Sequence, residues 1–139
     1  MAAGKMSIKL VRDSGVAFNC LSGQGHQVRL DGPPSVGGQD SGTRPMEMVL
    51  MGLAGCSAVD IVMILEKMRL PPGAMEIGVE ATRADAVPAV FTDIHMSFKA
   101  SGVPLDKLQR AADLSVEKYC SVAHMLQPKV KITWSVEAL

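Results

Sequence analysis

Two cysteines lie in settings that could support thiol chemistry. Cys56 stands between Gly55 and Ser57 within a long apolar segment, and Cys120 follows the run Glu117-Lys118-Tyr119. The two are 64 positions apart, so they can meet only in the folded structure. A thiol that is oxidised to a sulfenic acid needs a second thiol to resolve it as a disulfide. The pair therefore points to redox chemistry, although inert packing is the more frequent role of a buried cysteine.

Two glycines near Cys56 favour a functional role for this segment. Gly52 and Gly55 fall inside a predicted helix, where each costs about 1 kcal/mol relative to alanine. Their presence predicts close approach by another backbone or by a ligand. The third cysteine, Cys20, falls on a short predicted strand without such neighbours, and we interpret it as structural.

Other candidate sites are weaker. Cys120 and His124 are four residues apart, a spacing that on one helical face suits two metal ligands or a thiol–imidazole pair. Two ligands without a third nearby argue against a metal site. Gly23-Gln24-Gly25 lacks the third glycine and the following helix of a dinucleotide site. We therefore predict neither a metal nor a cofactor.

The elements that must position these residues alternate between strands and helices. Period-two patterns predict an antiparallel meander of three strands first and three further strands later, and period-3.6 patterns predict two helices. Gly and Pro mark a loop of about a dozen residues, which at this length is typically functional or mobile. The expected strands are Met6–Arg12, Val16–Leu21, His26–Asp31, Met75–Ala84, Val90–Lys99 and Val130–Val136; the loop is Gly32–Thr43; the helices run from Pro45 to about Arg69 and from near Pro104 towards Tyr119. This order predicts an α+β fold in a single domain over residues 1–139.

Composition excludes several classes of protein. Lys and Arg number 14 and Asp and Glu number 14, so the chain lacks the basic excess of most proteins that bind nucleic acid or anionic membranes. An apolar fraction of 47% argues against intrinsic disorder. Three cysteines at irregular spacing do not form a secreted disulfide framework. The polar segment Met1–Gly15 lacks the apolar core of a signal peptide, so we expect a cytoplasmic protein.

The apolar segment Met48–Leu65 is long enough to span a membrane. Asp60 lies within it, and a charge at the centre of a membrane span costs about 2.5–3.5 kcal/mol. We therefore predict a buried central helix of a soluble protein. The methionines that cluster on this helix are interpreted as core packing, with a pocket for an apolar ligand as the alternative; they are Met46, Met48, Met51, Met63 and Met68.

Two runs of sequence are similar to known cysteine motifs. The run Arg44–Asp60 (RPMEMVLMGLAGCSAVD) resembles the first cysteine motif of the OsmC/Ohr family, which comprises osmotically inducible and organic-hydroperoxide-resistance proteins. The run Leu114–Ala123 (LSVEKYCSVA) resembles the second. The order of expected elements agrees with that family from about Met6 to Val136, and the wording of both motifs is nearest to an OsmC-like subgroup.

The resemblance implies an intertwined α+β homodimer with antiparallel sheets around a long central helix and active sites at the subunit interface. It also implies a peroxiredoxin-like oxidoreductase that reduces organic hydroperoxides in oxidative-stress defence. Cys56 would be the peroxidatic thiol and Cys120 the resolving thiol, with a dithiol or lipoyl-type reductant and with no metal or flavin.

The thiol-activating residues of the family match this chain less closely. In active peroxidases an Arg–Glu pair flanks the peroxidatic thiol, but the family Glu position falls on Met46, one place before Glu47. On one helix Glu47 would lie roughly opposite Cys56 and about 13 Å away along the axis, where a capping role at the third helical position is the simpler interpretation. Arg12 is the nearest candidate for the arginine.

Two hypotheses follow from the sequence. The first is a dithiol-dependent peroxidase that uses Cys56 and Cys120, with Glu47 and Arg12 as candidate supporting residues. The second is a non-enzymatic protein of the same fold, which binds a small apolar ligand or a partner and whose thiols serve as a redox sensor or as core. Asp60, four residues after Cys56, would raise the pKa of that thiol if the two were close, which weighs against the first hypothesis.

Overall fold

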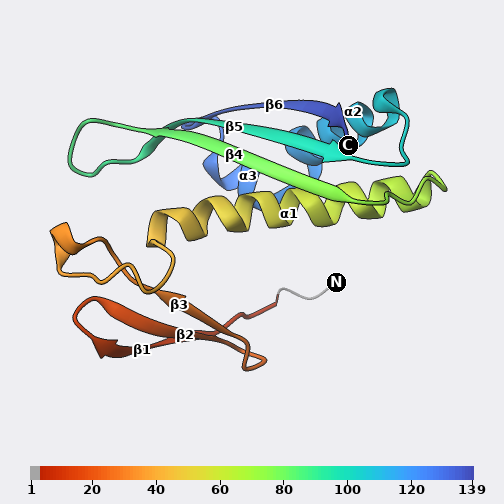
Figure 1. Ribbon diagram of the computed structural model, residues 1–139. Helices are drawn as coiled ribbons and strands as arrows, with labels where there is room; N and C mark the ends of the chain where they lie inside the picture. The colour runs from red at the N-terminus through yellow and green to blue at the C-terminus, as the bar shows by residue number, and fades with distance from the viewer. Residues whose placement is uncertain (1–3) are drawn as a thin grey trace. The chain divides into compact units, whose positions relative to one another are not determined.

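The computed structural model describes residues 4–139, so the first three residues of the polar N-terminal segment lie outside the described part. The chain forms two compact units, one ending at Val49 and one covering Leu50–Leu139. Figure 1 shows the elements of each. The single domain predicted over residues 1–139 stays a prediction.

The first unit contains a three-stranded antiparallel sheet in the order β1-β2-β3 (Figure 1). Its strands are β1 (Ile8–Ser14), β2 (Ala17–Ser22) and β3 (Gln27–Leu30). The register places Cys20 of β2 between Leu10 of β1 and Val28 of β3. Gly15 makes the turn between β1 and β2 with a φ of 53°, a left-handed conformation that favours glycine. The predicted meander is confirmed.

The carboxylate of Asp31 organises the loop that follows β3. It accepts hydrogen bonds from the backbone N–H groups of Gly32, Gln39 and Ser41 and, at 2.6 Å, from the Ser41 hydroxyl. These bonds, led by the one from the Ser41 side chain, hold the pKa of Asp31 well below its usual range. The loop also contains a short 3-10 turn, η1 (Pro34–Val36). The segment predicted as functional or mobile is thus fixed by a buried carboxylate.

Helix α1 (Pro45–Lys67) begins at a proline and carries Glu47 at its third position. The Arg44 backbone N–H donates to Glu47 Oε1 at 2.9 Å, which is one half of a capping box. The helix ends before Arg69, whose φ of 61° is left-handed. The predicted helix is therefore confirmed, with its end two residues earlier than expected.

Within the second unit, α1 buries only one of its faces. The buried residues repeat every four positions and are Leu53, Ser57, Ile61 and Leu65. On the opposite face Met51, Val59 and Met63 are more than half exposed. By length and composition α1 could cross a membrane, with a mean hydropathy of 2.2 over an 18-residue window of which 22% is buried. One chain thus buries only part of the helix that the sequence predicts to be buried.

The two glycines of α1 also differ from expectation. A Cβ atom added at Gly52 or Gly55 would meet nothing within 4 Å in the described chain. The close approach predicted at these positions is therefore not made by another segment of the same chain.

The second unit is built on the sheet β4-β5-β6 (Figure 1). Its strands are β4 (Met75–Arg83), β5 (Phe91–Ala100) and β6 (Lys131–Ala138). β4 and β5 are antiparallel, but β5 and β6 are parallel, so the expectation of purely antiparallel sheets is wrong here. The reason is the long helical crossover between β5 and β6, which returns the chain to the end where β5 begins.

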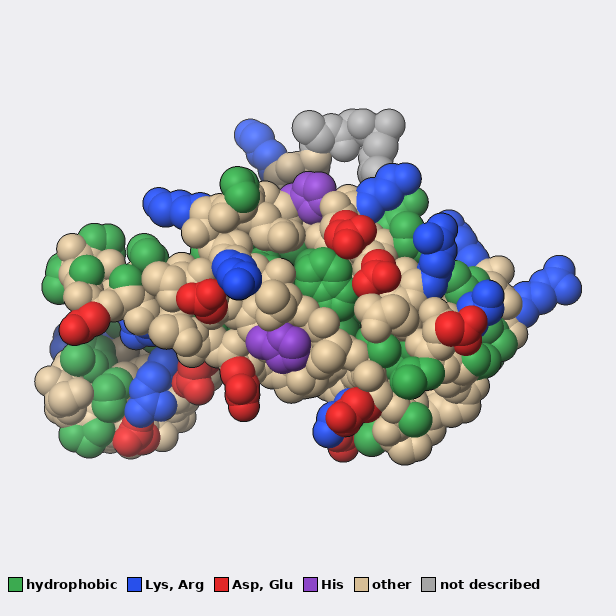
Figure 2. Space-filling model, turned by 90° about the horizontal axis from the view of Figure 1, so that it is seen from above, with side chains coloured by type: hydrophobic (Ala, Val, Ile, Leu, Met, Phe, Trp, Pro, Cys, Tyr) green, Lys and Arg blue, Asp and Glu red, His purple; other side chains and the backbone are tan. Residues whose placement is uncertain are grey.

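The two faces of this sheet differ in polarity. On β5 the residues Ile94, Met96, Phe98 and Ala100 are at most 1% exposed, and they form the centre of the core. The intervening positions carry Asp93, His95, Ser97 and Lys99. Seen from above the view of Figure 1, basic and acidic side chains are interspersed rather than gathered into one field (Figure 2). This agrees with the balanced charge of the sequence.

The crossover consists of three short helical segments instead of the one predicted helix. They are α2 (Leu105–Leu114), the π-helical turn η2 (Ser115–Tyr119) and α3 (Ser121–Leu126). The Cys120 N–H donates to the Ser115 carbonyl, five residues earlier, at 2.7 Å. This separation along the sequence is that of a π-turn, a feature that frequently occurs at functional sites. The chain then leaves helical geometry at Cys120, whose φ and ψ are −70° and 109°.

Candidate functional site

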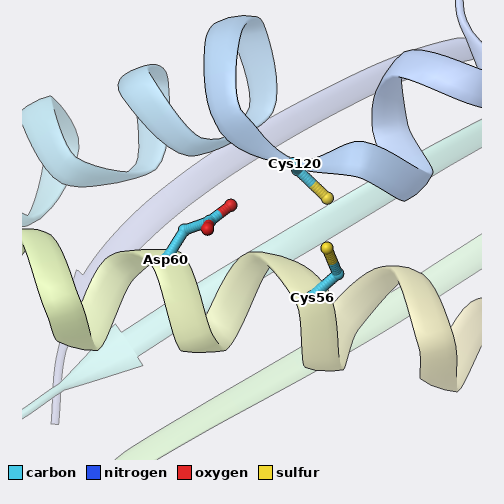
Figure 3. A group of neighbouring side chains, drawn as sticks. All are labelled: Cys56, Asp60 and Cys120. Atoms are coloured by element: carbon cyan, nitrogen blue, oxygen red, sulfur yellow. The ribbon is translucent and has the colours of Figure 1, made fainter. Parts of the chain in front are cut away.

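The structure brings Cys56 and Cys120 together. Their Sγ atoms lie within 4.8 Å of each other, and in Figure 3 they point toward one another from α1 and from the segment that precedes α3. Cys56 is half-buried, Cys120 is fully buried, and both are free thiols. The predicted meeting of the two thiols is confirmed, whereas their chemical roles stay predictions.

Cys120 caps helix α3 with its side chain. Its Sγ accepts hydrogen bonds from the Ala123 N–H at 3.4 Å and from the Ser57 hydroxyl at 3.3 Å. The spacing of Cys120 and His124 was only a weak candidate for a shared helical face, and the structure does not place the two residues on one, because Cys120 has extended backbone geometry and precedes the helix that contains His124. The His124 ring instead donates from Nε2 to the Glu117 carbonyl at 3.0 Å. The sulfur also donates to the Leu53 carbonyl at 4.0 Å, so Ser57, Ala123 and Leu53 are its polar partners.

Burial raises the pKa of the Cys120 thiol above its ordinary value of 9.0. The hydrogen bonds from Ser57 and Ala123 lower it, and the neighbouring Cys56 raises it further. Cys120 is consequently a protonated thiol at neutral pH.

This shift predicts how stability changes with pH. Below pH 9.0 the Cys120 thiol is protonated in both the folded and the unfolded chain. Its full contribution to the free energy of unfolding is then present. Between 9.0 and the higher folded-state pKa only the unfolded chain ionises, so the free energy of unfolding falls by at most about 1.4 kcal/mol per pH unit. Urea unfolding under reducing conditions should show this fall in the wild type, with a shallower slope in Cys120→Ala. Parallel curves for the two proteins would contradict the assignment.

Asp60 lies close to both cysteines and forms a cluster of three side chains with them. One of its carboxylate oxygens lies within 4.8 Å of both sulfurs, and all three side chains converge in Figure 3. Asp60 Oδ2 accepts a hydrogen bond from the buried Ser115 hydroxyl at 3.2 Å. The sequence showed the four-residue spacing of Cys56 and Asp60, which places them on one helical face. It gave no signal for Ser115, but Ser57 could have been found as the single polar residue in the buried stripe of α1.

The predicted supporting residues lie in the first unit and make local contacts there. Glu47 caps α1 as described, which confirms the simpler interpretation of that residue. Arg12 lies on β1, and its Nε donates to the Gly15 carbonyl at 2.9 Å. Arg44 pairs with Asp40 at 2.8 Å. A supporting role of Arg12 or Glu47 in thiol chemistry stays a prediction.

A pocket of about 490 Å³ lies beside the site in the second unit. Asp60 belongs to its wall, whereas neither cysteine does. Most of the other residues are apolar, and the full lining is Asp60, Met63, Ile64, Lys67, Met68, Leu114 and Tyr119. A pocket of this size and character suits a small, mainly apolar molecule.

Comparison with known proteins gives consistent matches. The sequence profile described as OsmC-like protein matches residues 38–135. Protein YhfA of Escherichia coli (strain K12) is 42% identical over 127 residues, which cover 90% of this chain and 92% of that protein.

Solved structures share the fold. A hypothetical protein from Aquifex aeolicus VF5 is 28% identical with a TM-score of 0.83, and the match covers 99% of both chains. An organic hydroperoxide resistance protein OsmC from Legionella pneumophila is 16% identical with a TM-score of 0.76, again over 99% of both chains. At that identity the second match shows the fold alone. The long helix with two small sheets is thus the α+β fold of OsmC-like structures.

Proposed function

The chain is a member of the OsmC-like protein family, and from this premise we propose that it is a soluble, thiol-dependent peroxidase acting on organic hydroperoxides in the cytoplasm. The observation that supports the proposal is the pair of free thiols, Cys56 and Cys120, with sulfurs within 4.8 Å. The exposure of the two sulfurs supports different roles, because the half-buried Cys56 is accessible to a substrate, whereas the buried Cys120 is placed to react with Cys56.

The reaction needs no group outside the two thiols, the peroxide and a dithiol. The Cys56 thiolate attacks one peroxide oxygen, so that an S–O bond forms, the O–O bond breaks and the alcohol leaves after taking up a proton. Cys120 then attacks the sulfenic sulfur, a disulfide forms, and water leaves with the thiol proton. A dithiol or lipoyl-type reductant restores both thiols and is itself oxidised to a disulfide.

The proposal includes an intertwined homodimer in which residues 1–139 act as one domain. Its support is the apolar face of α1 that one chain leaves uncovered, with Met51, Val59 and Met63 more than half exposed. The open space around Gly52 and Gly55 would admit a second backbone. Both observations are accounted for if α1 is buried between two chains.

A second candidate function is non-enzymatic binding of a small apolar ligand. The observation that favours it is the pocket beside Asp60, whose wall includes Met63, Ile64 and Met68. In this case the thiols would act as a redox sensor or as core packing.

The deciding experiment is to map the disulfide after a single oxidation. One equivalent of cumene hydroperoxide is added to the reduced full-length protein, which is then alkylated, digested and analysed by mass spectrometry. We expect one equivalent of cumyl alcohol and a Cys56–Cys120 disulfide. Cys20→Ser is the matched control, because Cys20 lies on β2 in the other unit, and this variant should behave as the wild type.

Unconsumed peroxide would overturn the peroxidase and leave ligand binding as the function. A disulfide that contains Cys20 would overturn the assigned pair.

A further inference from the structure

The site contains a third metal-ligating group that thiol chemistry alone does not require. Cys56 Sγ, Cys120 Sγ and a carboxylate oxygen of Asp60 lie within 4.8 Å of one another, and Figure 3 shows their side chains converging from two segments. We propose that these residues form a binding site for zinc(II). This departs from the metal-free site that the sequence led us to predict.

The donor set selects the class of cation. Two cysteine thiols, which release their protons when the metal binds, and one carboxylate suit zinc(II), whereas magnesium and calcium require ligand shells made of oxygen. Bond lengths of about 2.3 Å to sulfur and 2.0–2.2 Å to oxygen place tetrahedral ligand atoms about 3.5–3.8 Å apart. Because Cys56 is only half-buried, rotation of its side chain can move its sulfur from within 4.8 Å of the other two ligand atoms toward this spacing.

The surroundings hold two of the three ligands in place. The Ser115 hydroxyl donates to Asp60 Oδ2, which fixes the carboxylate and leaves its other oxygen for the cation. Ser57 and the Ala123 N–H donate to Cys120 Sγ. Outer partners of this kind orient metal ligands and contribute to affinity.

The charges and access also suit a cation. Among residues 4–139 the ion pairs involve other carboxylates, and Asp60 has no Lys, Arg or His partner within 4.0 Å. Asp60 also lines the pocket of about 490 Å³, through which a metal and a water could reach the site. Three protein ligands with water in the fourth position form an open zinc site.

A bound cation would occupy both sulfurs and so prevent their oxidation to a disulfide. This regulatory consequence rests on the proposed peroxidase function, whereas metal binding does not.

The test is a titration of the reduced, chelator-treated full-length protein. Cobalt(II) is added as a spectroscopic probe, and zinc(II) affinity is measured by competition with a chromophoric chelator. We expect one cobalt per chain, with the thiolate charge-transfer and tetrahedral d–d absorption bands, and displacement of cobalt by zinc. Cys20→Ser is the matched thiol control and should bind as the wild type does.

Single substitutions distinguish the residues that bind the metal from the residues that only orient them. Loss of an outer partner of a metal ligand can weaken binding by up to about 100-fold. Cys56→Ser removes a ligand itself, so it should weaken zinc binding by more than this. Ser115→Ala removes only an outer partner and should weaken binding by about 10-fold. Asp60→Asn keeps the side-chain volume and should weaken binding by at least about 10-fold with an unchanged circular dichroism spectrum. Wild-type affinity in Cys56→Ser or Asp60→Asn, or octahedral cobalt spectra, would overturn the proposal.

A peroxide assay with and without chelator separates the two ideas. Turnover without tight zinc binding overturns the metal site alone, whereas zinc binding without turnover overturns the peroxidase alone. If both hold, one equivalent of zinc should suppress turnover, and chelator should restore it.

Discussion

Replacement of Cys56 by serine is expected to abolish hydroperoxide turnover. A serine hydroxyl remains protonated at neutral pH and is a far weaker nucleophile towards the peroxide bond than a thiolate. Cys120 cannot replace Cys56, because its sulfur is fully buried and its pKa is raised by that burial. The loss in kcat/KM should be at least about 1,000-fold, as for other enzymes that lose their nucleophile. The measurement is a steady-state assay with cumene hydroperoxide and a dithiol.

Two further variants make this result specific. Cys20→Ser should retain wild-type turnover, since Cys20 packs within the sheet of the first unit. Cys120→Ser should consume one equivalent of peroxide and then accumulate a sulfenic acid that dimedone traps at Cys56. Equal turnover in Cys56→Ser and the wild type, or turnover in neither, would contradict the peroxidase.

Local patterns in the sequence were sufficient for most of the secondary structure. Alternation marked the strands of both sheets, and a proline followed by Glu47 marked the start of α1. The break at Cys120 could not be predicted in this way. At this break the Ser57 hydroxyl, 63 positions earlier, hydrogen-bonds the Cys120 sulfur, and a contact between such distant segments leaves no local pattern. The parallel pairing of β5 and β6 likewise follows from how the crossover returns, which no local pattern specifies.

The candidate site was predictable to a smaller extent. Spacing alone places Cys56 and Asp60 on one face of α1, but only the resemblance to known motifs indicated that Cys120 would join them. Ser115 was unpredictable, because the helical pattern of the sequence continues through it. Its contact with Asp60 arises from the packing of η2 on α1. Local sequence patterns do not predict packing between segments that are distant along the chain.

One chain leaves an apolar face of α1 exposed to water. Met51, Gly55, Val59 and Met63 repeat every four residues opposite the buried stripe, and three of these four side chains are large and more than half exposed. An apolar stripe of this length is unfavourable in water. If a second chain covers it, the glycine in the stripe is explained as well, because glycine permits close approach of a partner.

Val59→Lys is therefore expected to dissociate the proposed homodimer. A lysine in the covered stripe would bury a charge without a partner, and the dimer dissociation constant should rise by at least about thirtyfold, the effect of losing one strong interface residue. Analytical ultracentrifugation measures the shift. Val87→Lys is the matched control, because Val87 is 100% exposed in the turn between β4 and β5, and it should leave the dimer intact. In a chain that works as a monomer, Val59→Lys would be neutral or slightly stabilising, since lysine favours helix more than valine does; that result would contradict the dimer and leave the exposed stripe to another partner.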